Sequence, residues 1–285
     1  TLQKRPYGGV LKFFDPLLAV ANIPAPPWPD VVIATGNLTV PVARFIKSKA
    51  PQVFTVQMMR PSGSLKAFDA VAVPKHDTPK PAANIIPTTG APNRITDELL
   101  KTAYQEWEAP FAHLPTKRLA VLIGGSSKHY DFTPEKAETL AQTLKTFARE
   151  QGYGLLVTTS RRTGEAQEKV LKDALDGPQT FFWNGEGKNP YMGFLAHAEA
   201  IVATVDSVSM VSEGCSTGKP VYVFDLPALT KGKFGRFYGL LQNQKRIQNF
   251  DGTAMEAPPH PLSDAAHVAG FVRGMLVRKH FATKG

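Results

Sequence analysis

Cysteine is nearly absent from this sequence: Cys215 is the single one among 285 residues. One cysteine excludes an intramolecular disulfide and a cysteine-based metal cage, and it favours a reducing compartment. No uninterrupted apolar run is long enough to cross a bilayer, and the first residues lack the pattern of a signal peptide. We therefore expect a cytoplasmic protein whose membrane contact, where it has one, is at the inner face.

Other signatures are also missing. No low-complexity tract occurs, and hydrophobic residues make up 42% of the chain, so a globular protein is expected. No short window combines a Lys/Arg block with aromatic residues, which disfavours nucleic acid as a partner. The sequence does have a formal net charge of +9 and a pI near 9.5. This surplus favours an anionic partner, whether a nucleotide phosphate, an acidic glycan or a lipid surface.

Short β-branched runs alternate with helical stretches along most of the chain. In the first third, DVVIATG (30–36) and QVFTVQMMRP (52–61) lie on either side of a helical stretch that stops at Pro51, and FDAVAVPKHD (68–77) follows. Strand, helix and strand in close succession predict a βαβ unit and a parallel sheet. We therefore predict an α/β protein.

A second series of strands and helices begins after residue 114. LAVLIGGSSKHY (119–130) restarts the rhythm, so the predicted boundary lies at residues 114–117. Residues 1–114 and 115–262 are expected to form two Rossmann-like domains. Helices are predicted over 93–114, Pro134–Gln151, Glu165–Leu175 and 190–198, from Ser209, and over 263–281 with Ser263 as N-cap.

Strand after strand of the second half ends in small polar residues. Ligands of open parallel sheets bind beyond the carboxyl ends of the strands, so these loops are expected to converge on one site. They supply hydroxyls, backbone N–H groups and two guanidinium groups, a set that suits phosphate. The loops cover residues 124–127, 158–163, 183–187 and 206–209.

Two of these loops have a specific physical reason to bind an anion. In Gly124-Gly125-Ser126-Ser127, glycine lets the backbone approach an anion closely, and the following helix presents unpaired N–H groups. Arg161 and Arg162 follow a strand, where a bidentate grip on phosphate is possible. Taken singly, a Gly-Gly is more often an ordinary tight turn, and two arginines are as easily a surface pair.

Ser207 and Ser209 fall where a strand passes into a helix, so they can cap it and hydrogen-bond a phosphate. Glu213 lies one turn beyond Ser209 on the same face. A carboxylate there can accept both hydroxyls of a ribose. A cap and an exposed helical acid are the alternative interpretation, which is favoured when the neighbouring loops are ignored.

The segment DSVSMVSEGCSTGKPV (206–221) resembles the donor-site helix of GT-B glycosyltransferases, particularly of the family that includes MurG, where Ser-Glu and Gly-x-Pro hold a UDP-sugar. Four segments of the chain resemble the mitochondrial fission ELM1 family, a group of bacterial and plant proteins assigned to the GT-B glycosyltransferases. In order they are FDAVAVPKHD, IGGSSKHYDFT, TTSRRTG and FWNGEGKNPYMGFLAHAEAIVATVDSVSMVSEGCSTGKPVYVF. The resemblance covers most of residues 30–226.

The resemblance implies a GT-B type fold, two Rossmann-like domains with parallel sheets facing a cleft, with helix 263–285 packing back on the first domain. It implies that residues 124–127 and 207–209 meet the diphosphate of a nucleotide-sugar and that Glu213 meets its ribose. Family members usually begin with a further strand and Gly-containing loop, a unit predicted to be missing here. The donor-pocket residues are expected to be Gly124, Gly125, Ser126, Ser127, Ser160, Arg161, Arg162, Glu186, Asn189, Asp206, Ser207, Ser209 and Glu213.

The first domain is expected to bind the acceptor, because polar residues also follow its strands. His76 and Asp77 are the predicted catalytic pair, since an imidazole oriented by a carboxylate can take a proton from a hydroxyl near neutral pH. An isolated His-Asp pair is more often structural, and His129 on the donor side is the rival. The predicted acceptor-binding residues are Thr35, Gly36, Asn37, Gln57 and Arg60.

The expected function is transfer of a sugar from a nucleotide diphosphate, with UDP as the expected nucleotide, to an acceptor hydroxyl of a cell-envelope glycan or lipid. No metal and no separate cofactor are expected, and the basic surface suits peripheral contact with an anionic membrane. Two alternatives stay open. A sugar-nucleotide epimerase of the same fold would need no acceptor, and a non-catalytic scaffold in membrane organisation would bind nucleotide without turnover.

Overall fold

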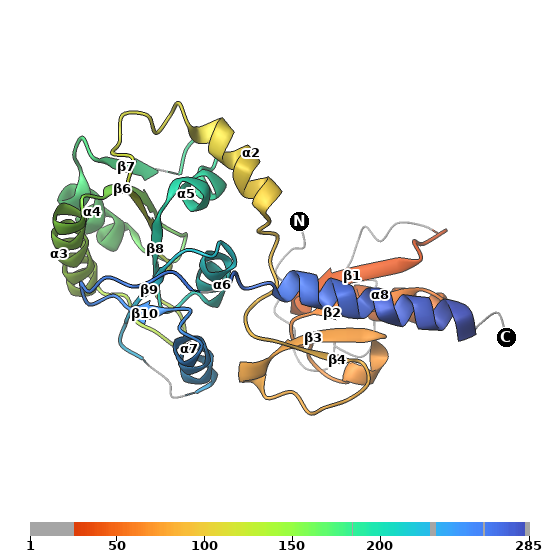
Figure 1. Ribbon diagram of the computed structural model, residues 1–285. Helices are drawn as coiled ribbons and strands as arrows, with labels where there is room; N and C mark the ends of the chain where they lie inside the picture. Colours follow the sequence, from red (N-terminus) through yellow and green to blue (C-terminus); the bar gives the residue numbers. More distant parts are fainter. Residues whose placement is uncertain (1–25, 184, 229–231, 259, 283–285) are drawn as a thin grey trace. The chain divides into compact units, whose positions relative to one another are not determined.

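The computed structural model describes residues 26–183, 185–228, 232–258 and 260–282, and it divides into two compact units (Figure 1). The first unit comprises Thr1–Pro92 together with Asp264–Gly285, and the second comprises Asn93–Ser263. Each is built around a parallel sheet. The predicted α/β class with two Rossmann-like units is confirmed.

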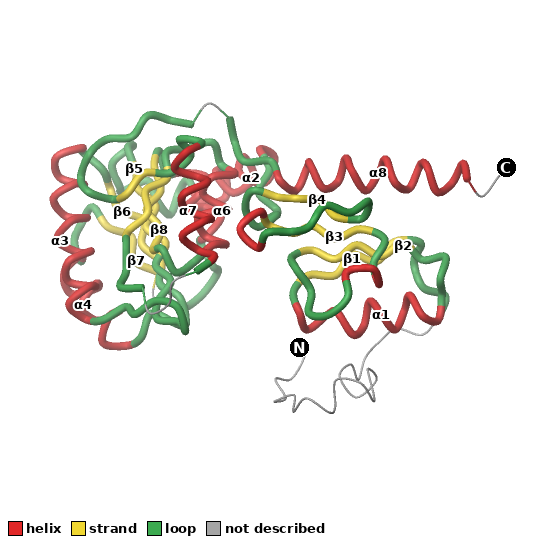
Figure 2. The backbone as a smooth tube through the Cα atoms, turned by 90° about the horizontal axis from the view of Figure 1, so that it is seen from below, coloured by secondary structure: helices red, strands yellow, loops and turns green. Residues whose placement is uncertain are grey.

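The first unit has a four-stranded sheet in the order β1-β2-β3-β4. Helix α1 (Val40–Lys49) covers one face, where Val71 and Ile85 are buried, and α8 (Asp264–Ala282) covers the other, where Val56 and Ile86 are buried (Figure 2). Three single turns of 3-10 helix lie in the connections. The remaining bounds are β1 (Val31–Thr35), β2 (Phe54–Met58), β3 (Ala70–Pro74), β4 (Ile85–Thr88), η1 (Asn37–Thr39), η2 (Leu65–Ala67) and η3 (Lys75–Asp77).

The second unit has a six-stranded sheet in the order β10-β9-β8-β5-β6-β7. Helices α3 and α4 lie together on one face, and α2, α5 and α6 lie on the other (Figures 1 and 2). The strands are β5 (Arg118–Leu122), β6 (Gly154–Thr158), β7 (Thr180–Trp183), β8 (Ala200–Thr204), β9 (Val221–Phe224) and β10 (Gln248–Asn249). The helices are α2 (Asp97–Trp107), α3 (Pro134–Gln151), α4 (Glu165–Leu175), α5 (Tyr191–His197), α6 (Val208–Ser216) and α7 (Lys233–Asn243).

Local sequence explains why the second unit forms these elements. The side chain of Thr133 accepts a hydrogen bond from Lys136 N and caps α3, Pro134 is its first residue, and Gly152 ends it with φ 73°. The residues of β5, β6 and β8 are all buried, as expected for central parallel strands covered on both faces. α3 and α4 have the predicted bounds, whereas the sequence analysis contained no prediction for α7.

The division into units differs from the predicted boundary at residues 114–117, because residues 93–114 belong to the second unit. Helix α2 packs on α5, where the ring of Tyr104 stacks on that of His197 with centroids 4.0 Å apart. Helical periodicity shows that α2 has an apolar face but not which sheet that face meets. In the first unit, the carboxylate of Asp264 accepts hydrogen bonds from Thr89 N and Gly90 N at 2.9 and 2.6 Å, which fixes the start of α8 beside the end of β4.

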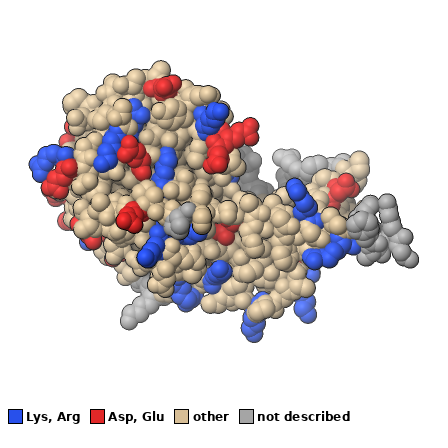
Figure 3. Space-filling view, viewed as in Figure 1, with Lys and Arg blue, Asp and Glu red and all other residues tan. Residues whose placement is uncertain are grey.

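Charge is divided unequally between the units. The chain has 33 basic and 24 acidic residues; residues 93–263 hold 19 of each, which leaves 14 basic and 5 acidic residues in the first unit. The whole formal surplus of +9 therefore belongs to the first unit. Figure 3 shows acidic and basic side chains interleaved over the second unit and mostly basic ones over the first. Within the described part of the chain, no helix is both long enough and apolar enough to span a bilayer.

Candidate functional site

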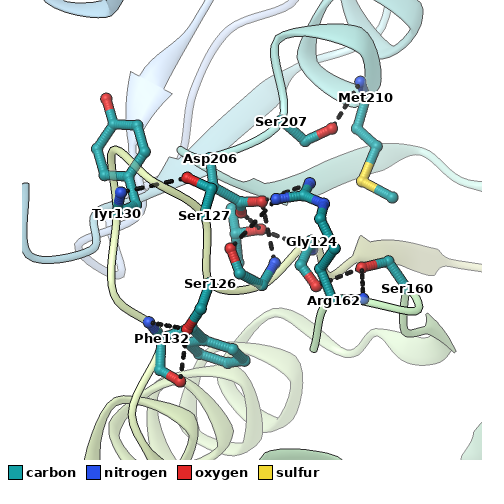
Figure 4. A network of polar contacts seen from close by, with 12 residues as sticks. Gly124, Ser126, Ser127, Tyr130, Phe132, Ser160, Arg162, Asp206, Ser207 and Met210 are labelled. Atoms are coloured by element: carbon teal, nitrogen blue, oxygen red, sulfur yellow. Dashed lines mark hydrogen bonds and ion pairs between the residues drawn. The ribbon is translucent and has the colours of Figure 1, made fainter. Parts of the chain in front are cut away.

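Three neighbouring strands of the second unit, β8, β5 and β6, end in polar loops that meet at one edge of the sheet (Figure 4). The loops are residues 124–127 after β5, 159–164 after β6 and 205–207 after β8. This is the edge at which parallel α/β sheets bind ligands. The convergence of these three loops agrees with the expectation from the sequence.

Asp206 lies at the centre of this edge, and its side chain is 0% exposed. One carboxylate oxygen accepts from Gly125 N at 3.0 Å and pairs with the Arg162 guanidinium at 2.7 Å. The other accepts from Thr204 Oγ1 at 2.6 Å, and that hydroxyl in turn accepts from Gly124 N at 2.8 Å. A buried carboxylate requires such partners, so Asp206 ties the three loops together.

The loop after β6 is held to the loop after β5 by hydroxyls. Ser160 Oγ and Thr163 Oγ1 both donate to the carbonyl oxygen of Gly124, at 2.6 and 2.5 Å. Ser126 N donates to the carbonyl oxygen of Arg162 at 3.1 Å. Ser160 therefore has a structural contact in addition to its predicted place in the donor pocket.

Both glycines of the Gly-Gly pair are required, because atoms of the neighbouring loops lie where a Cβ would stand. A Cβ on Gly124 would lie 2.2 Å from an Asp206 carboxylate oxygen, and a Cβ on Gly125, which has φ 152°, would lie 2.0 Å from the Arg162 carbonyl oxygen. No side chain fits at either position. The glycines thus permit loop-to-loop packing, and this packing accounts for them without a bound anion.

The backbone N–H groups of residues 124–127 are not the free phosphate donors that the sequence predicted. Those of Gly124, Gly125 and Ser126 donate to the partners already described, and that of Ser127 donates to the carbonyl oxygen of Tyr130 at 2.9 Å. Of these four N–H groups, that of Gly125 donates to the Asp206 carboxylate itself. The hydroxyls of Ser126 and Ser127 likewise accept from backbone N–H groups of the loop 129–132.

Donors remain at the start of α6. Ser207 Oγ accepts from Met210 N at 3.4 Å and caps the helix, as predicted. The N–H groups of Val208 and Ser209 have no acceptor among the described residues, and the helix dipole makes this end electropositive. Arg162, whose side chain is 44% exposed, adds a guanidinium held by Asp206. This end of α6 can accommodate the negative charge of a diphosphate.

Glu213 lies on α6 beyond this end and is partly buried. Its Oε2 accepts a hydrogen bond of 2.5 Å from the hydroxyl of Tyr191, the first residue of α5. Burial raises the pKa of the Glu213 carboxyl, while the Tyr191 hydrogen bond and the charge of Arg94 act in the opposite direction. Tyr191 and Arg94 were missed by the sequence analysis. Tyr191 follows Asn-Pro at a predicted helix start, which was the available signal.

The other predicted donor residues lie on exposed loops of the second unit. Arg161 is exposed beside Arg162. Asn189 Oδ1 accepts from Tyr191 N at 2.9 Å, so Asn189 orders the start of α5, and the carbonyl oxygen of Glu186 accepts from Trp183 Nε1 at 2.8 Å. Asn184, in the same predicted loop, lies outside the described residues. None of these contacts brings Glu186 into the Asp206 network.

The predicted acceptor residues gather at the carboxyl ends of β1 and β2 in the first unit. Gly36 has φ 74°, and its carbonyl oxygen accepts from Gln57 Nε2 at 3.3 Å. Asn37 Oδ1 accepts from Ser62 N at 2.9 Å, and Arg60 donates to the carbonyl oxygen of Asp77 at 2.9 Å. Thr35 is exposed at the end of β1. Their assignment to an acceptor stays a prediction.

The predicted catalytic pair lies on the short turn η3 after β3. His76 is 3% exposed and Asp77 is partly buried. A general base must reach the hydroxyl that it deprotonates, so a buried imidazole needs local opening before it can act. The rival, His129, lies in the loop after β5, where its ring packs edge-on against Phe234 with centroids 4.8 Å apart. The catalytic assignment stays a prediction.

Comparison with known proteins gives the family of the chain. The family model described as Mitochondrial fission ELM1 matches residues 14–276. The chain belongs to this family. It is 31% identical over 284 residues to the Mitochondrial fission protein ELM1 of Arabidopsis thaliana, an alignment that covers 90% of this chain and 66% of the plant protein. The chain therefore spans slightly less than two thirds of that relative's length.

Solved structures similar to this ELM1-family chain give its fold. The UDP-GlcNAc 2-epimerase of Neisseria meningitidis, solved with UDP-GlcNAc, superposes with a TM-score of 0.53 and 11% identity over 87% of this chain and 76% of that one. The UDP-GlcNAc 2-epimerase of Methanocaldococcus jannaschii gives 0.51 and 13% over 86% and 77%. At these identities the likeness concerns the fold alone, which is of the GT-B type.

Proposed function

We propose that this ELM1-family chain is a glycosyltransferase that binds a nucleotide-diphosphate sugar, with UDP as the nucleotide, at the carboxyl edge of the second unit's sheet. The observation that carries the proposal is the pairing on α6 of unsatisfied N–H groups at its first turn with a carboxylate, Glu213, fixed by Tyr191. The helix N-terminus suits a diphosphate, and a carboxylate further along the same helix can accept from the hydroxyls of a ribose. The GT-B fold of sugar-nucleotide enzymes supports the same assignment.

The reaction proposed for this site is direct transfer of the sugar. The acceptor hydroxyl oxygen forms a bond to the anomeric carbon, the bond from that carbon to the diphosphate oxygen breaks, and the hydroxyl proton passes to a base. The nucleoside diphosphate leaves with its charge stabilised by the N-terminus of α6 and by Arg162. His76, oriented by Asp77, is the proposed base. No metal and no further cofactor enter this scheme.

The acceptor is proposed to be a cell-envelope glycan or a lipid-linked sugar, reached at the cytoplasmic face of a membrane. The basic surplus of the first unit supports an anionic acceptor surface, since the second unit has as many acidic as basic residues. This places the nucleotide and the anionic surface on different units of the protein.

An epimerase is the second candidate, because the Neisseria and Methanocaldococcus proteins that share this fold are UDP-GlcNAc 2-epimerases. An epimerase would alter the sugar of the bound nucleotide without any acceptor. A non-catalytic scaffold, which the fission name of the family suggests, would bind nucleotide and leave it unchanged. Product analysis separates the three.

The decisive experiment is calorimetric titration of the purified chain with UDP, GDP, CMP and their sugars. We expect selective binding of one nucleotide class, weakened about tenfold or more in Glu213→Ala and less in Ser207→Ala, which removes a cap as well as a hydroxyl. The matched control is Glu165→Ala, which removes an exposed acid from the first turn of α4. Absence of binding by the folded wild type would refute the proposal.

A further inference from the structure

Tyr191 stands where α5 begins, and its hydroxyl is directed at α6. It donates the 2.5 Å hydrogen bond to Glu213 Oε2, and its own backbone N–H is held by Asn189 Oδ1 at 2.9 Å. Its ring packs against the core of the second unit. The hydroxyl is therefore placed from three sides, by the ring, by the start of α5 and by the carboxylate.

In this pair the Tyr191 hydroxyl is the hydrogen-bond donor and the Glu213 carboxylate is the acceptor. Burial and the charge of Glu213 raise the pKa of Tyr191 well above its usual value, so the phenol stays a donor at every physiological pH. The charge of Arg94, a residue in the segment ahead of α2, lowers the pKa of the Glu213 carboxyl. That segment is anchored to α6, because Asn93 Nδ2 donates to Ser216 Oγ at 3.0 Å.

Glu213 has one oxygen committed to Tyr191, and no hydrogen bond of the described residues uses Oε1. Both acceptor sites of Oε1 and one of Oε2 are therefore left for a ribose. Accepting from two vicinal hydroxyls requires a carboxylate of fixed direction, and the Tyr191 hydrogen bond fixes the direction of Glu213.

We infer that Tyr191 is a positioning residue that aims the Glu213 carboxylate at the two vicinal ribose hydroxyls, so that the site selects ribonucleotides over nucleotides that lack both hydroxyls. This inference rests on the proposed function. It goes beyond it in naming the residue that determines this selectivity.

The test titrates UDP and 2′,3′-dideoxy-UDP, which lacks both ribose hydroxyls, into the wild type and Tyr191→Phe. The substitution removes one hydroxyl and keeps the ring. The Kd for UDP is expected to rise about tenfold, the usual scale for losing a hydrogen bond to a charged group, while the Kd for 2′,3′-dideoxy-UDP changes less than about twofold. An equal rise for both nucleotides, or no rise for UDP, would overturn the inference.

The matched control is Tyr153→Phe. Tyr153 precedes β6 at the opposite end of the sheet, where it lines a cavity of about 590 Å³. This variant should bind both nucleotides as the wild type does. If the folded wild type binds no UDP at all, the proposed function fails and the inference fails with it; binding of UDP without a Tyr191 effect removes only the inference.

A second measurement needs no nucleotide. The Glu213 carboxyl is followed by ¹³C NMR during a pH titration, with Glu213→Gln to assign its signal. The hydrogen bond from Tyr191 lowers the carboxyl pKa, so Tyr191→Phe should raise it while Tyr153→Phe leaves it unchanged. An unchanged titration in Tyr191→Phe would show that the hydroxyl does not act on Glu213, and the inference would be overturned.

Discussion

The two units of this chain share a parallel α/β design but differ in where their charges are used. The second unit is neutral overall and places its central carboxylate, Asp206, with 0% side-chain exposure at the carboxyl edge of the sheet. The first unit carries the +9 surplus, and its carboxylate Asp69, which lies at the amino end of β3, is 21% exposed and pairs with Lys47 at 2.8 Å. The two carboxylates therefore differ in exposure, and the net charge of the chain belongs to the first unit.

The difference bears on how each unit could bind an anion. A basic chain with a sequence motif typical of phosphate binding suggests that its surplus positive charge binds the phosphate. In the structure, the proposed phosphate end of α6 relies on a helix terminus and on Arg162, which is already paired. The surplus lies in the other unit. Substitutions made in one unit at a time test whether the units are independent in this way.

The largest effect is expected from Gly125→Ala. The new Cβ would lie 2.0 Å from the Arg162 carbonyl oxygen, so the loops at the carboxyl edge must separate. We expect a loss of about 4 kcal/mol in the unfolding free energy of the second unit, since both strain and loss of the Asp206 contacts contribute. Hydrogen exchange read by mass spectrometry measures each unit separately, and the first unit should keep its protection.

The matched control for this substitution is Gly177→Ala. Gly177 has φ 159°, close to the 152° of Gly125, but nothing lies within 4 Å of the added Cβ. It should cost about 1 kcal/mol, the backbone share alone. Equal losses in the two variants would mean that the Gly-Gly pair is an ordinary turn and that the Asp206 network does not depend on it.

A middle-sized effect is expected for membrane association. Lys75 and Lys80 are exposed in the first unit, and Lys75→Glu with Lys80→Glu should weaken binding to phosphatidylcholine vesicles that contain phosphatidylglycerol by roughly ten- to a hundredfold, at about 1 kcal/mol for each lysine lost. Lys101→Glu with Lys172→Glu changes the second unit by the same charge and should leave binding within a few-fold. Co-sedimentation at two salt concentrations measures both. Equal weakening by the two pairs would make the effect one of net charge rather than of a surface.

Much of the fold was predictable because its elements are locally determined. The bounds of α3 and α4 follow from a Thr-Pro start, Gly152 and regular apolar spacing, and Ser207 was recognisable as a cap. The sequence could not predict that α2 belongs to the second unit, since its packing on α5 is decided by contacts distant in sequence.

The candidate site was predictable in position but not in detail. Loops after neighbouring parallel strands must meet, so Gly124, Ser160 and Asp206 come together as expected. The sequence could not show that the Asp206 carboxylate turns inward and accepts from Gly125 N, because an aspartate at a strand end can pair equally well with the protein or with a ligand. Tyr191 was missed for a related reason: its partner Glu213 is 22 residues away.

The smallest expected effect is a difference in acid sensitivity between the units, which His197 and Asp69 predict. Arg118 Nη1 lies 3.0 Å from His197 Nδ1, and His197 Nε2 lies 2.9 Å from the carbonyl oxygen of Tyr104. Arginine can only donate, so Nδ1 accepts and Nε2 carries the proton. Burial lowers the pKa of His197, and the charges of Arg118 and Lys219 add to this against the opposing hydrogen bond to Tyr104.

The direction in which stability changes with pH follows from proton binding. Below its ordinary value of 6.5, the unfolded histidine binds a proton that the folded one resists, so the unfolding free energy of the second unit falls as the pH drops below about 6.5. Burial alone would raise the pKa of Asp69, but hydrogen bonds from Lys47 and Thr55 bring it below the ordinary value of 3.8. The stability that the Asp69 carboxylate adds is therefore present above pH 3.8 and is lost only in more acidic solution. Unit-resolved hydrogen exchange from pH 7 to pH 5 should therefore show weakening in the second unit first.

The variant His197→Asn tests this assignment, because its side-chain oxygen can replace Nδ1 as an acceptor. It should lower the unfolding free energy by about 1 kcal/mol at pH 7 and remove the fall of that free energy between pH 7 and pH 5. A slope that survives in this variant, or one of equal size in the first unit, would assign the acid sensitivity to groups other than His197.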